Sequence, residues 1–264
     1  RTRRQRQMCI RDRVNEITKP TSNAQFKEYD SIVASGEQVT SGLLALAIQN
    51  LGIQARSWLG WQIGFQTDSS HSKARIENIK SDLILESLNN GEVAVIAGFQ
   101  GITEENRIAT LGRGGSDTSA VALAAALKAD RCDIYTDVDG IYTTDPRIVK
   151  KARKLNKIAY EEMLEMASLG AKVLQLRSVE MAMKHGVKVQ VLSSFEDVPG
   201  SLLVDEEEVM EKRLVTGVTY SNNETQITLT NVPNNPGIAA AIFAPLTNKE
   251  INCLLYTSDA ADES

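Results

Sequence analysis

The segment 111–118 (LGRGGSDT) holds the residues of this chain that are best suited to bind an anion. It lies directly before 119–130, an alanine-rich run that we predict to be a helix. The start of a helix offers N–H groups and the positive end of its dipole to an anion. Glycines let a ligand approach the backbone, and Arg113 offers a planar fork that matches a carboxylate or a phosphate. We expect Ser116 or Asp117 to cap the helix.

The spacing within this segment does not name the anion. It is neither that of a Walker loop nor that of a G-x-G-x-x-G fingerprint. An ordinary glycine-rich turn into a capped helix is therefore the alternative to an anion site.

A second polar segment, 136–147 (TDVDGIYTTDPR), follows an apolar run at 132–136 that we predict to be a buried strand. Ligands of open α/β sheets bind beyond the carboxyl ends of the strands, which makes this loop a candidate binding segment. Asp137 and Asp139 could hold a cation such as Mg²⁺, or they could form an ordinary Asx turn. Two further side chains suit packing on a nucleotide or pairing with it: Tyr142 and Arg147.

Three isolated residues each have an ordinary explanation beside a functional one. Glu37 precedes a helix and could favour the helix dipole or bind a substrate ammonium group. Lys172 lies at the start of a helix predicted at 171–185, where its charge opposes the dipole, so it either faces a phosphate or is solvated. Cys132 lies on an apolar strand and is most simply a small core residue.

Composition limits the class of protein. The 264 residues are 42% hydrophobic and 24% charged, as in globular domains with a core. A net charge of −5 argues against sequence-independent nucleic-acid binding, and no apolar run approaches the length of a membrane span. Three cysteines and two histidines give neither a disulfide framework nor a histidine metal site, so we expect a cytoplasmic protein.

Helical and strand patterns alternate along most of the chain. This alternation predicts an α/β fold with a mainly parallel sheet sandwiched by helices. The predicted helices are 39–51, 119–130, 160–168 and 171–185, and the predicted strands are 92–99 (buried on both faces), 132–136, 187–192 and 201–204. After a charged run at 205–213, a strand at 226–231 and a helix at 238–247 begin a small βαβ module.

Both ends of the chain differ from the rest. Residues 1–13 carry six arginines without a helical or strand pattern. The strings 8–13 and 253–262 resemble translated sequencing-adapter sequence. We therefore expect 1–13 and 253–264 to be non-native tails.

The residues alone point to a phosphoryl-transfer enzyme whose substrate stays open, because such catalysis consists mainly of positioning and charge stabilisation around a bound anion. Six motifs, in order and at matching spacing over roughly 28–252, resemble the bacterial aspartate kinases of the amino-acid kinase family: 35–39, 97–101, 110–117, 135–147, 161–172 and 176–180. The resemblance implies transfer of the γ-phosphoryl group of ATP to the β-carboxylate of L-aspartate, the first step of lysine, threonine and methionine biosynthesis.

The resemblance also implies a role for each matched residue. Arg113 would bind the α-carboxylate of aspartate and Glu37 its ammonium group, Asp117 would orient the reacting groups, and Lys172 would approach the phosphates. Phe99, Gly114, Gly115 and Ser116 would complete the aspartate pocket. The nucleotide would be lined by Tyr135, Thr136, Asp137, Ile141, Tyr142, Thr143, Thr144, Asp145, Pro146, Arg147 and Ala171. Mg²⁺ would be carried by ATP, without a metal site made of protein ligands.

The match implies a kinase domain over 14–205, and a linker with a partial ACT domain over 206–252. In the family the ACT domain binds end-product amino acids such as lysine or threonine, and we expect the complete protein to be a homo-oligomer. The family begins with a strand carrying Lys-Phe-Gly-Gly, which has no match here, so we expect an internal fragment that is inactive alone. The alternatives are another amino-acid kinase, acting on glutamate, acetylglutamate or a nucleoside monophosphate, and a non-catalytic amino-acid-sensing module.

Overall fold

The computed structural model describes residues 10, 14, 17, 20–171, 173–209, 215–219 and 237–238. The chain divides into two compact units, Arg1–Ser221 and Asn222–Ser264. Every helix and strand named below belongs to the first unit. The predicted βαβ module and both predicted tails fall outside the described residues, apart from single positions within them.

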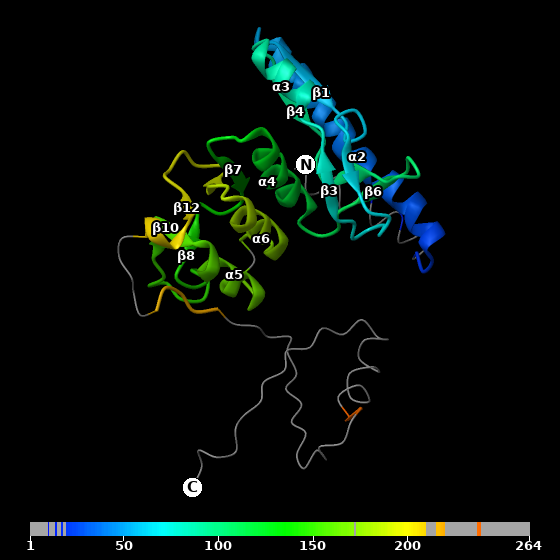
Figure 1. The fold of residues 1–264 in the computed structure, drawn as a ribbon. Helices are drawn as coiled ribbons and strands as arrows, with labels where there is room; N and C mark the ends of the chain where they lie inside the picture. The colour runs from blue at the N-terminus through cyan, green and yellow to red at the C-terminus, as the bar shows by residue number, and fades with distance from the viewer. Residues whose placement is uncertain are drawn as a thin grey trace. The chain divides into compact units, whose positions relative to one another are not determined.

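The first part of this unit is arranged around the long helix α2 (Asn23–Asn50), which packs against β1 (Ala55–Trp58), β4 (Val93–Ile96) and β6 (Ile108–Thr110) (Figure 1). Strands β1 and β4 form a parallel pair, and a four-stranded sheet has the order β3-β2-β5-β6. The remaining elements are β2 (Phe65–Thr67), β3 (Ile76–Ile79), α3 (Asp82–Asn89) and β5 (Gln100–Ile102).

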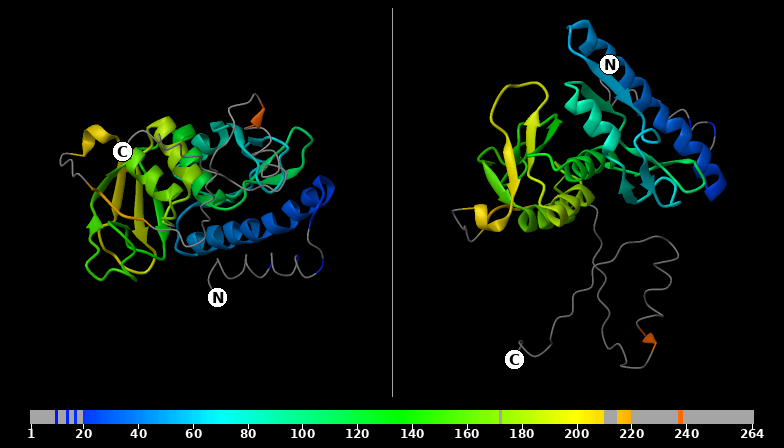
Figure 2. Two further views of the ribbon diagram at one scale, coloured as in Figure 1. Left: turned by 90° about the horizontal axis from the view of Figure 1, so that it is seen from below. Right: turned by 45° about the horizontal axis from the view of Figure 1, so that its top comes forward.

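The second part contains a four-stranded sheet of order β10-β12-β11-β7. Helices α4 and α6 lie side by side between this sheet and the first part of the unit (Figures 1 and 2). The elements are α4 (Gly115–Leu127), β7 (Cys132–Thr136), β8 (Ile141–Tyr142), β9 (Lys154–Leu155), β10 (Lys157–Ala159), α5 (Tyr160–Ser168), α6 (Leu176–His185), β11 (Val189–Ser193), β12 (Ser201–Val204) and the short helix η1 (Glu206–Glu208).

The predicted α/β class is confirmed, but the strand pairing is mixed. Of the described pairs, β1–β4, β2–β5, β7–β11 and β10–β12 are parallel, and β2–β3, β5–β6, β8–β9 and β11–β12 are antiparallel. The antiparallel pairs join strands that follow one another in the sequence, where a hairpin needs no crossover helix.

Helix α4 is buried on two sides, and this explains its alanine-rich sequence. Val121 and Ala124 belong to the core that includes β7, β11 and α6, whereas Leu123 belongs to the core that includes Leu111 and Phe65. Small side chains allow neighbouring elements to approach such a helix from both directions. The middle of α4 is therefore packed between two cores.

Several predicted elements are confirmed in type and corrected in extent. The strand at 132–136 and the helix at 160–168 have the predicted bounds. The strand predicted at 187–192 is β11, which begins two residues later and ends one residue later. Prediction of strand 92–99 was wrong in extent and burial, because β4 covers four residues and Val93 at its start is 39% exposed. Helix 39–51 is only the second half of α2, because the helix begins after Ser22.

The early start of α2 follows from its N-terminal cap. The Ser22 hydroxyl accepts from the N–H of Gln25, whose side-chain oxygen accepts from the N–H of Ser22 at 3.2 Å, forming a capping box. By length and composition, α2 is the one helix among the described residues that could cross a membrane, which the sequence analysis did not foresee. Length and composition are weak evidence for a membrane span here. Helix α2 carries two buried carboxylates, Asp30 and Glu37, on the face that packs against the strands.

Candidate active site

The glycine-rich segment turns sharply between β6 and α4. Gly112 and Gly114 both adopt left-handed backbone conformations, with φ of +78° and +71°. A Cβ atom on Gly114 would lie 2.0 Å from Cγ of Gln175, and one on Gly112 would lie 2.6 Å from the carbonyl oxygen of Ser72. Only glycine fits these two positions, because both the backbone conformation and the neighbouring atoms exclude a side chain.

The predicted cap of α4 is wrong. Gly114 is the N-cap residue and makes no side-chain cap hydrogen bond, whereas Ser116 and Asp117 lie inside the first turn. The left-handed conformation of Gly114 starts the helix four residues before the predicted start. The partly buried Ser116 and Asp117 and the exposed Arg113 are therefore grouped at the helix start.

Side chains at the start of α6 also contact the glycine-rich segment. The Arg177 guanidinium donates from Nη1 to the carbonyl of Leu111 at 2.7 Å and from Nη2 to the carbonyl of Ala74 at 2.8 Å. With Gln175 against Gly114, the start of α6 contacts the segment at two points. Arg177 belongs to one of the matched motifs, but the sequence analysis assigned it no role.

A buried carboxylate that the sequence analysis missed anchors the strand before the segment. Asp30 of α2 has no exposed surface and accepts hydrogen bonds from His71, Ser72 and Thr110. Thr110 is the last residue of β6 and directly precedes Leu111. Asp30 lies on α2 at helical spacing from the other buried residues of that helix, a pattern that could have identified it as buried.

Phe99 packs against the start of α4. Its φ is +70°, its N–H donates to Oγ of Ser119 at 2.9 Å, and its carbonyl accepts from Leu111 N–H at 2.9 Å. A Cβ atom on Gly115 would lie 2.8 Å from Cδ2 of the Phe99 ring, so the ring covers that glycine. These contacts bring together two residues that were predicted to share a substrate pocket, Phe99 and Gly115.

Glu37 is only 1% exposed and lies on the face of α2 that packs against the strands. Its neighbour Gln38 donates to the side-chain oxygen of Gln100 at 2.8 Å, and Gln100 directly follows Phe99. The structure therefore places the predicted ammonium ligand one residue from a contact with the 99–100 segment.

The loop after β7 is more exposed and is held by charged side chains. Tyr135 is 65% exposed. Asp139 accepts from the Tyr142 hydroxyl at 3.0 Å and from the Lys154 ammonium at 3.2 Å. Burial favours the neutral form of Asp139, but these donors outweigh it and hold the pKa of its carboxyl below the ordinary value. Burial and the hydrogen bond to Asp139 raise the pKa of Tyr142.

These pairings bear on the alternative of a cation bound by Asp137 and Asp139. The ammonium of Lys154 already neutralises the Asp139 carboxylate. Among the described residues, no three histidine, cysteine, aspartate or glutamate side chains gather as a metal site. In this structure the Asp139 carboxylate is therefore occupied by donors of the protein.

Further along the same loop, Asp145 and Arg147 form an ion pair and a hydrogen bond to the main chain. The carboxylate of Asp145 accepts from Nε of Arg147 at 3.0 Å, from Nη2 at 2.8 Å and from the Arg147 N–H at 2.9 Å. The amides of Ile148 and Val149 donate to the Asp145 carbonyl, so Asp145-Pro146 forms a turn. The Arg147 side chain is 85% exposed.

The helix predicted at 171–185 is corrected in extent, since α6 begins at Leu176, and Ala171 does not lie at its start. The amide of Ala171 donates to the carbonyl of Met166 at 2.9 Å, at the end of α5. Lys172 itself lies outside the described residues.

The base of the loop is a well-packed core. Cys132, the first residue of β7, is buried as predicted, and burial raises the pKa of its thiol to about 11, with Asp133 and Asp117 adding to the rise. On β12, the buried Ser201 hydroxyl accepts from the N–H of Ile141 at 2.8 Å and so holds β8.

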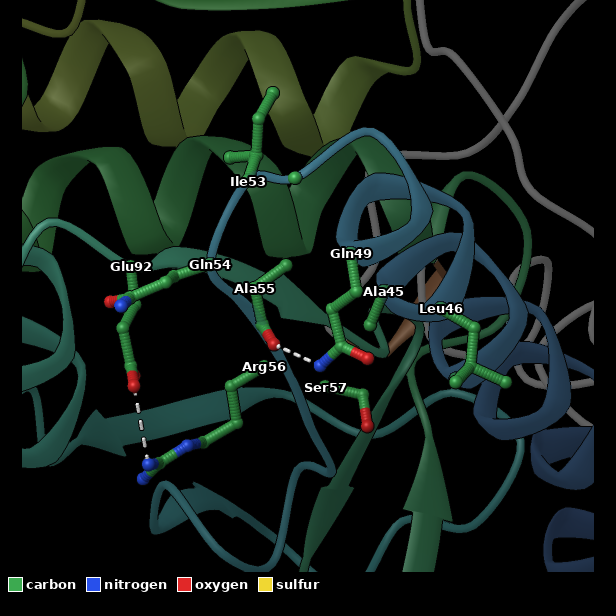
Figure 3. Close-up of a pocket in the computed structure, with 11 residues that line it drawn as sticks. Ala45, Leu46, Gln49, Ile53, Gln54, Ala55, Arg56, Ser57 and Glu92 are labelled. Atoms are coloured by element: carbon green, nitrogen blue, oxygen red, sulfur yellow. Dashed lines mark hydrogen bonds and ion pairs between the residues drawn. The ribbon is translucent and has the colours of Figure 1, made fainter.

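An open groove of about 760 Å³ lies elsewhere, at the end of α2 (Figure 3). Two contacts tie its polar lining together: Gln49 donates to the carbonyl of Ala55 at 2.8 Å, and Arg56 contacts Glu92 at 3.3 Å. No predicted site residue lines it. The groove therefore does not coincide with the candidate active site.

Comparisons with known proteins identify relatives over most of the chain. The model of the amino acid kinase family matches residues 2–193. An aspartate kinase of Pseudomonas putida is 52% identical over 239 residues, which are 90% of this chain and 58% of that protein.

Solved structures agree with the sequence comparison. The crystal structure of E. coli aspartokinase III in complex with aspartate and ADP has a TM-score of 0.72 and 28% identity, covering 97% of this chain and 57% of that one. The same enzyme in complex with lysine and aspartate has a TM-score of 0.69 and 30% identity, covering 90% of this chain and 54% of that one. This chain spans little more than half the length of these relatives.

Proposed function

Because the chain belongs to the amino acid kinase family, we propose that it is part of an aspartate kinase, which transfers the γ-phosphoryl group of ATP to the β-carboxylate of L-aspartate. The observation that carries the proposal is the glycine-rich turn at the start of α4, with its left-handed glycines and its contacts to α6. Arg113 is exposed on this turn, and the buried Glu37 lies on the helix that packs against the preceding strand. A cation and an anion on neighbouring elements suit the two charged groups of an amino acid.

In the proposed complex, the Arg113 guanidinium pairs with the α-carboxylate of aspartate and Glu37 accepts from its ammonium group. Phe99, Gly114, Gly115 and Ser116 form the walls around the substrate. A side-chain carboxylate oxygen then attacks the γ-phosphorus, the bond from that phosphorus to the ADP oxygen breaks, and 4-phospho-L-aspartate and ADP result. Asp117 orients the reacting groups. The protein contributes mainly positioning and charge, as in other phosphoryl transfers.

For the nucleotide, we assign the loop after β7 and the segment after α5. Support for the loop comes from its position beyond the carboxyl end of the parallel strand β7. The ADP complex of the E. coli relative supports nucleotide binding in general. The assigned residues are Tyr135, Thr136, Asp137, Ile141, Tyr142, Thr143, Thr144, Asp145, Pro146, Arg147, Ala171 and Lys172. Mg²⁺ bound to the phosphates of ATP would lower the charge of the transferred group.

Residues after about 205 are assigned to a linker and the beginning of an ACT domain that binds an end-product amino acid such as lysine or threonine. The complex of the E. coli relative with lysine supports this class of ligand. A homo-oligomer in the cytoplasm completes the proposal.

Binding measurements on the 264-residue chain test the substrate. Isothermal titration calorimetry with aspartate, glutamate and ADP should show binding of aspartate and ADP, with glutamate weaker. Arg113→Ala should abolish aspartate binding and leave ADP binding unchanged, because the lost pair is specific to the α-carboxylate. Tighter binding of glutamate would indicate another amino-acid kinase, and aspartate binding without ADP binding would indicate a sensing module.

Catalysis is tested separately, with ATP, Mg²⁺, aspartate and hydroxylamine, which traps the acyl phosphate as a hydroxamate. We expect no hydroxamate from this chain, because no Lys-Phe-Gly-Gly strand occurs in its sequence. Hydroxamate formation would overturn that expectation and would at the same time support the proposed reaction.

A further inference from the structure

Asp30 and Glu37 lie on the same face of α2. The buried residues of this helix recur at helical spacing: Asp30, Val33, Ala34, Glu37, Ser41 and Ala45. Two turns separate the carboxylates, about 10 Å along the helix axis. Asp30 has no exposed surface, and a buried carboxylate is unfavourable unless donors surround it.

The residues that donate to Asp30, His71, Ser72 and Thr110, come from outside α2. Oδ2 accepts from the N–H groups of Ser72 and Thr110, both at 2.9 Å, and from Nδ1 of His71 at 3.0 Å. Oδ1 accepts from the hydroxyls of Ser72 at 3.0 Å and Thr110 at 2.6 Å. Because the carboxylate only accepts, His71 must carry its hydrogen on Nδ1. One side chain thus joins the helix to two separate segments.

Those two segments form the sides of the glycine-rich turn. Thr110 leads directly into Leu111 and Gly112, and the Ser72 carbonyl lies against Gly112 from the other side. The turn that presents Arg113 is therefore fixed to the helix that carries Glu37 through Asp30. Neither Arg113 nor Glu37 is among the partners that Asp30 holds.

We propose that Asp30 is a positioning residue for the amino-acid half of the site, because it sets the placement of Arg113 relative to Glu37. The identity of the bound amino acid rests on the proposed function, whereas the placement of the turn by Asp30 rests on the hydrogen bonds alone. Asp30 does not contact the substrate. It acts by holding the helix and the turn in one arrangement, so that both charged ends of the substrate are bound at once.

Two substitutions of Asp30 distinguish the loss of its hydrogen-bond acceptors from the loss of its negative charge. In Asp30→Asn the amide oxygen can take the place of Oδ2 and accept from the two N–H groups, while its NH₂ group faces hydroxyls that can accept. Asp30→Ala removes every acceptor. Ser41→Ala is a matched control, because Ser41 is buried on the same face and its hydroxyl donates within α2, to the carbonyl of Gln38 at 2.9 Å.

Calorimetry on the folded variants should show that Asp30→Ala weakens aspartate binding by about tenfold or more while ADP affinity stays within about twofold, the pattern of a misplaced ligand pair. Asp30→Asn should restore most of the aspartate affinity, and Ser41→Ala should change neither. A parallel loss of both affinities, or an unchanged aspartate affinity in Asp30→Ala, would show that Asp30 is only structural.

Hydrogen exchange makes the test independent of the substrate. Asp30→Ala should speed exchange of the amides at 110–115 and leave β7 unchanged, whereas Asp30→Asn and Ser41→Ala should leave both unchanged. If the parent chain binds no aspartate, the proposed function is wrong, and this measurement still tests whether Asp30 holds the glycine-rich turn in place. Unchanged exchange at 110–115 in Asp30→Ala would overturn it.

Discussion

The two halves of the proposed site are held by different kinds of contact. The glycine-rich turn is held by groups with little or reduced exposure: the buried Asp30 accepts from two segments, and the partly buried Arg177 donates to two main-chain carbonyls. The loop after β7 is held largely by side-chain ion pairs nearer the surface, such as Lys154 with Asp139 and Arg147 with Asp145. A broken buried contact leaves an unsatisfied polar group, whereas an exposed ion pair contributes little. Substitutions in the first half should therefore lower stability, and those in the second half should mainly change binding.

The largest effect is expected for Gly114→Ala. The new Cβ would meet Gln175 at 2.0 Å in a left-handed backbone conformation, so strain and overpacking add. We expect the free energy of unfolding to fall by about 3 kcal/mol. Gly52→Ala is the control, because Gly52 has φ +79° and nothing within 4 Å of its Cβ position. Urea unfolding of the two variants measures the difference.

If Gly114→Ala and Gly52→Ala lose the same stability, the collision with Gln175 does not occur and the turn is looser than described. In that case the glycine-rich turn would not be the more tightly packed half of the proposed site. A larger loss in Gly114→Ala alone isolates the packing contribution, because the backbone strain is common to both.

A second, smaller effect should appear where the loop after β7 has a buried anchor of its own. Ser201→Ala removes the hydroxyl that accepts from Ile141 N–H and leaves that amide without this partner. A loss of about 2 kcal/mol is expected in urea unfolding. Ser168→Ala is the control, since its hydroxyl is exposed and donates to a carbonyl of its own helix, and it should be nearly neutral. A neutral Ser201→Ala would show that β8 is held by other contacts.

The sequence predicted the elements whose signals are local. Strand β7 and helix α5 have the predicted bounds, because an apolar run and an amphipathic repeat are each complete within the segment. The glycine-rich turn was identified for the same reason. The helix start at Gly114 was missed, because a glycine cap leaves no side-chain signature and Ser116 and Asp117 are commoner caps.

The buried contacts that support the turn could not be read from the sequence. Asp30 meets partners that lie 41, 42 and 80 positions away, and Arg177 reaches back 66 positions to Leu111. Helical and strand periodicities relate residues only a few positions apart, so they do not predict pairs at these distances in the sequence. The resemblance assigned roles to residues expected to touch substrate, and it passed over those that hold them in place. The assigned roles themselves stay predictions.

Between the two halves, Cys132 offers a pH-dependent probe of the packing at the start of β7. Its thiol has a pKa raised to about 11 by burial, against 9.0 for an unperturbed group. As the pH rises, the unfolded chain therefore loses the thiol proton at a lower pH than the folded protein does. The contribution of the protonated thiol to the free energy of unfolding is complete below pH 9 and is lost as the pH rises toward 11. From pH 8 to 10 the wild type should lose about 1 kcal/mol more than Cys132→Ala. Equal pH dependence of urea unfolding in the two proteins would show that the thiol is solvated.

The smallest effect on stability is expected for Arg147→Ala, which tests the second half of the comparison directly. The Arg147 side chain is 85% exposed, and its pair with Asp145 lies within one turn of the loop. Because water and salt screen such a pair, urea unfolding should change by less than about 0.5 kcal/mol. The proposed nucleotide role predicts weaker ADP binding with unchanged aspartate binding, the reverse of the pattern expected for Asp30→Ala. Arg153→Ala, an exposed arginine of the same connection, is the matched control and should leave both affinities unchanged. A large loss of stability in Arg147→Ala would mean that this loop, like the glycine-rich turn, depends on its polar contacts for its fold, and the distinction between the two halves would not hold.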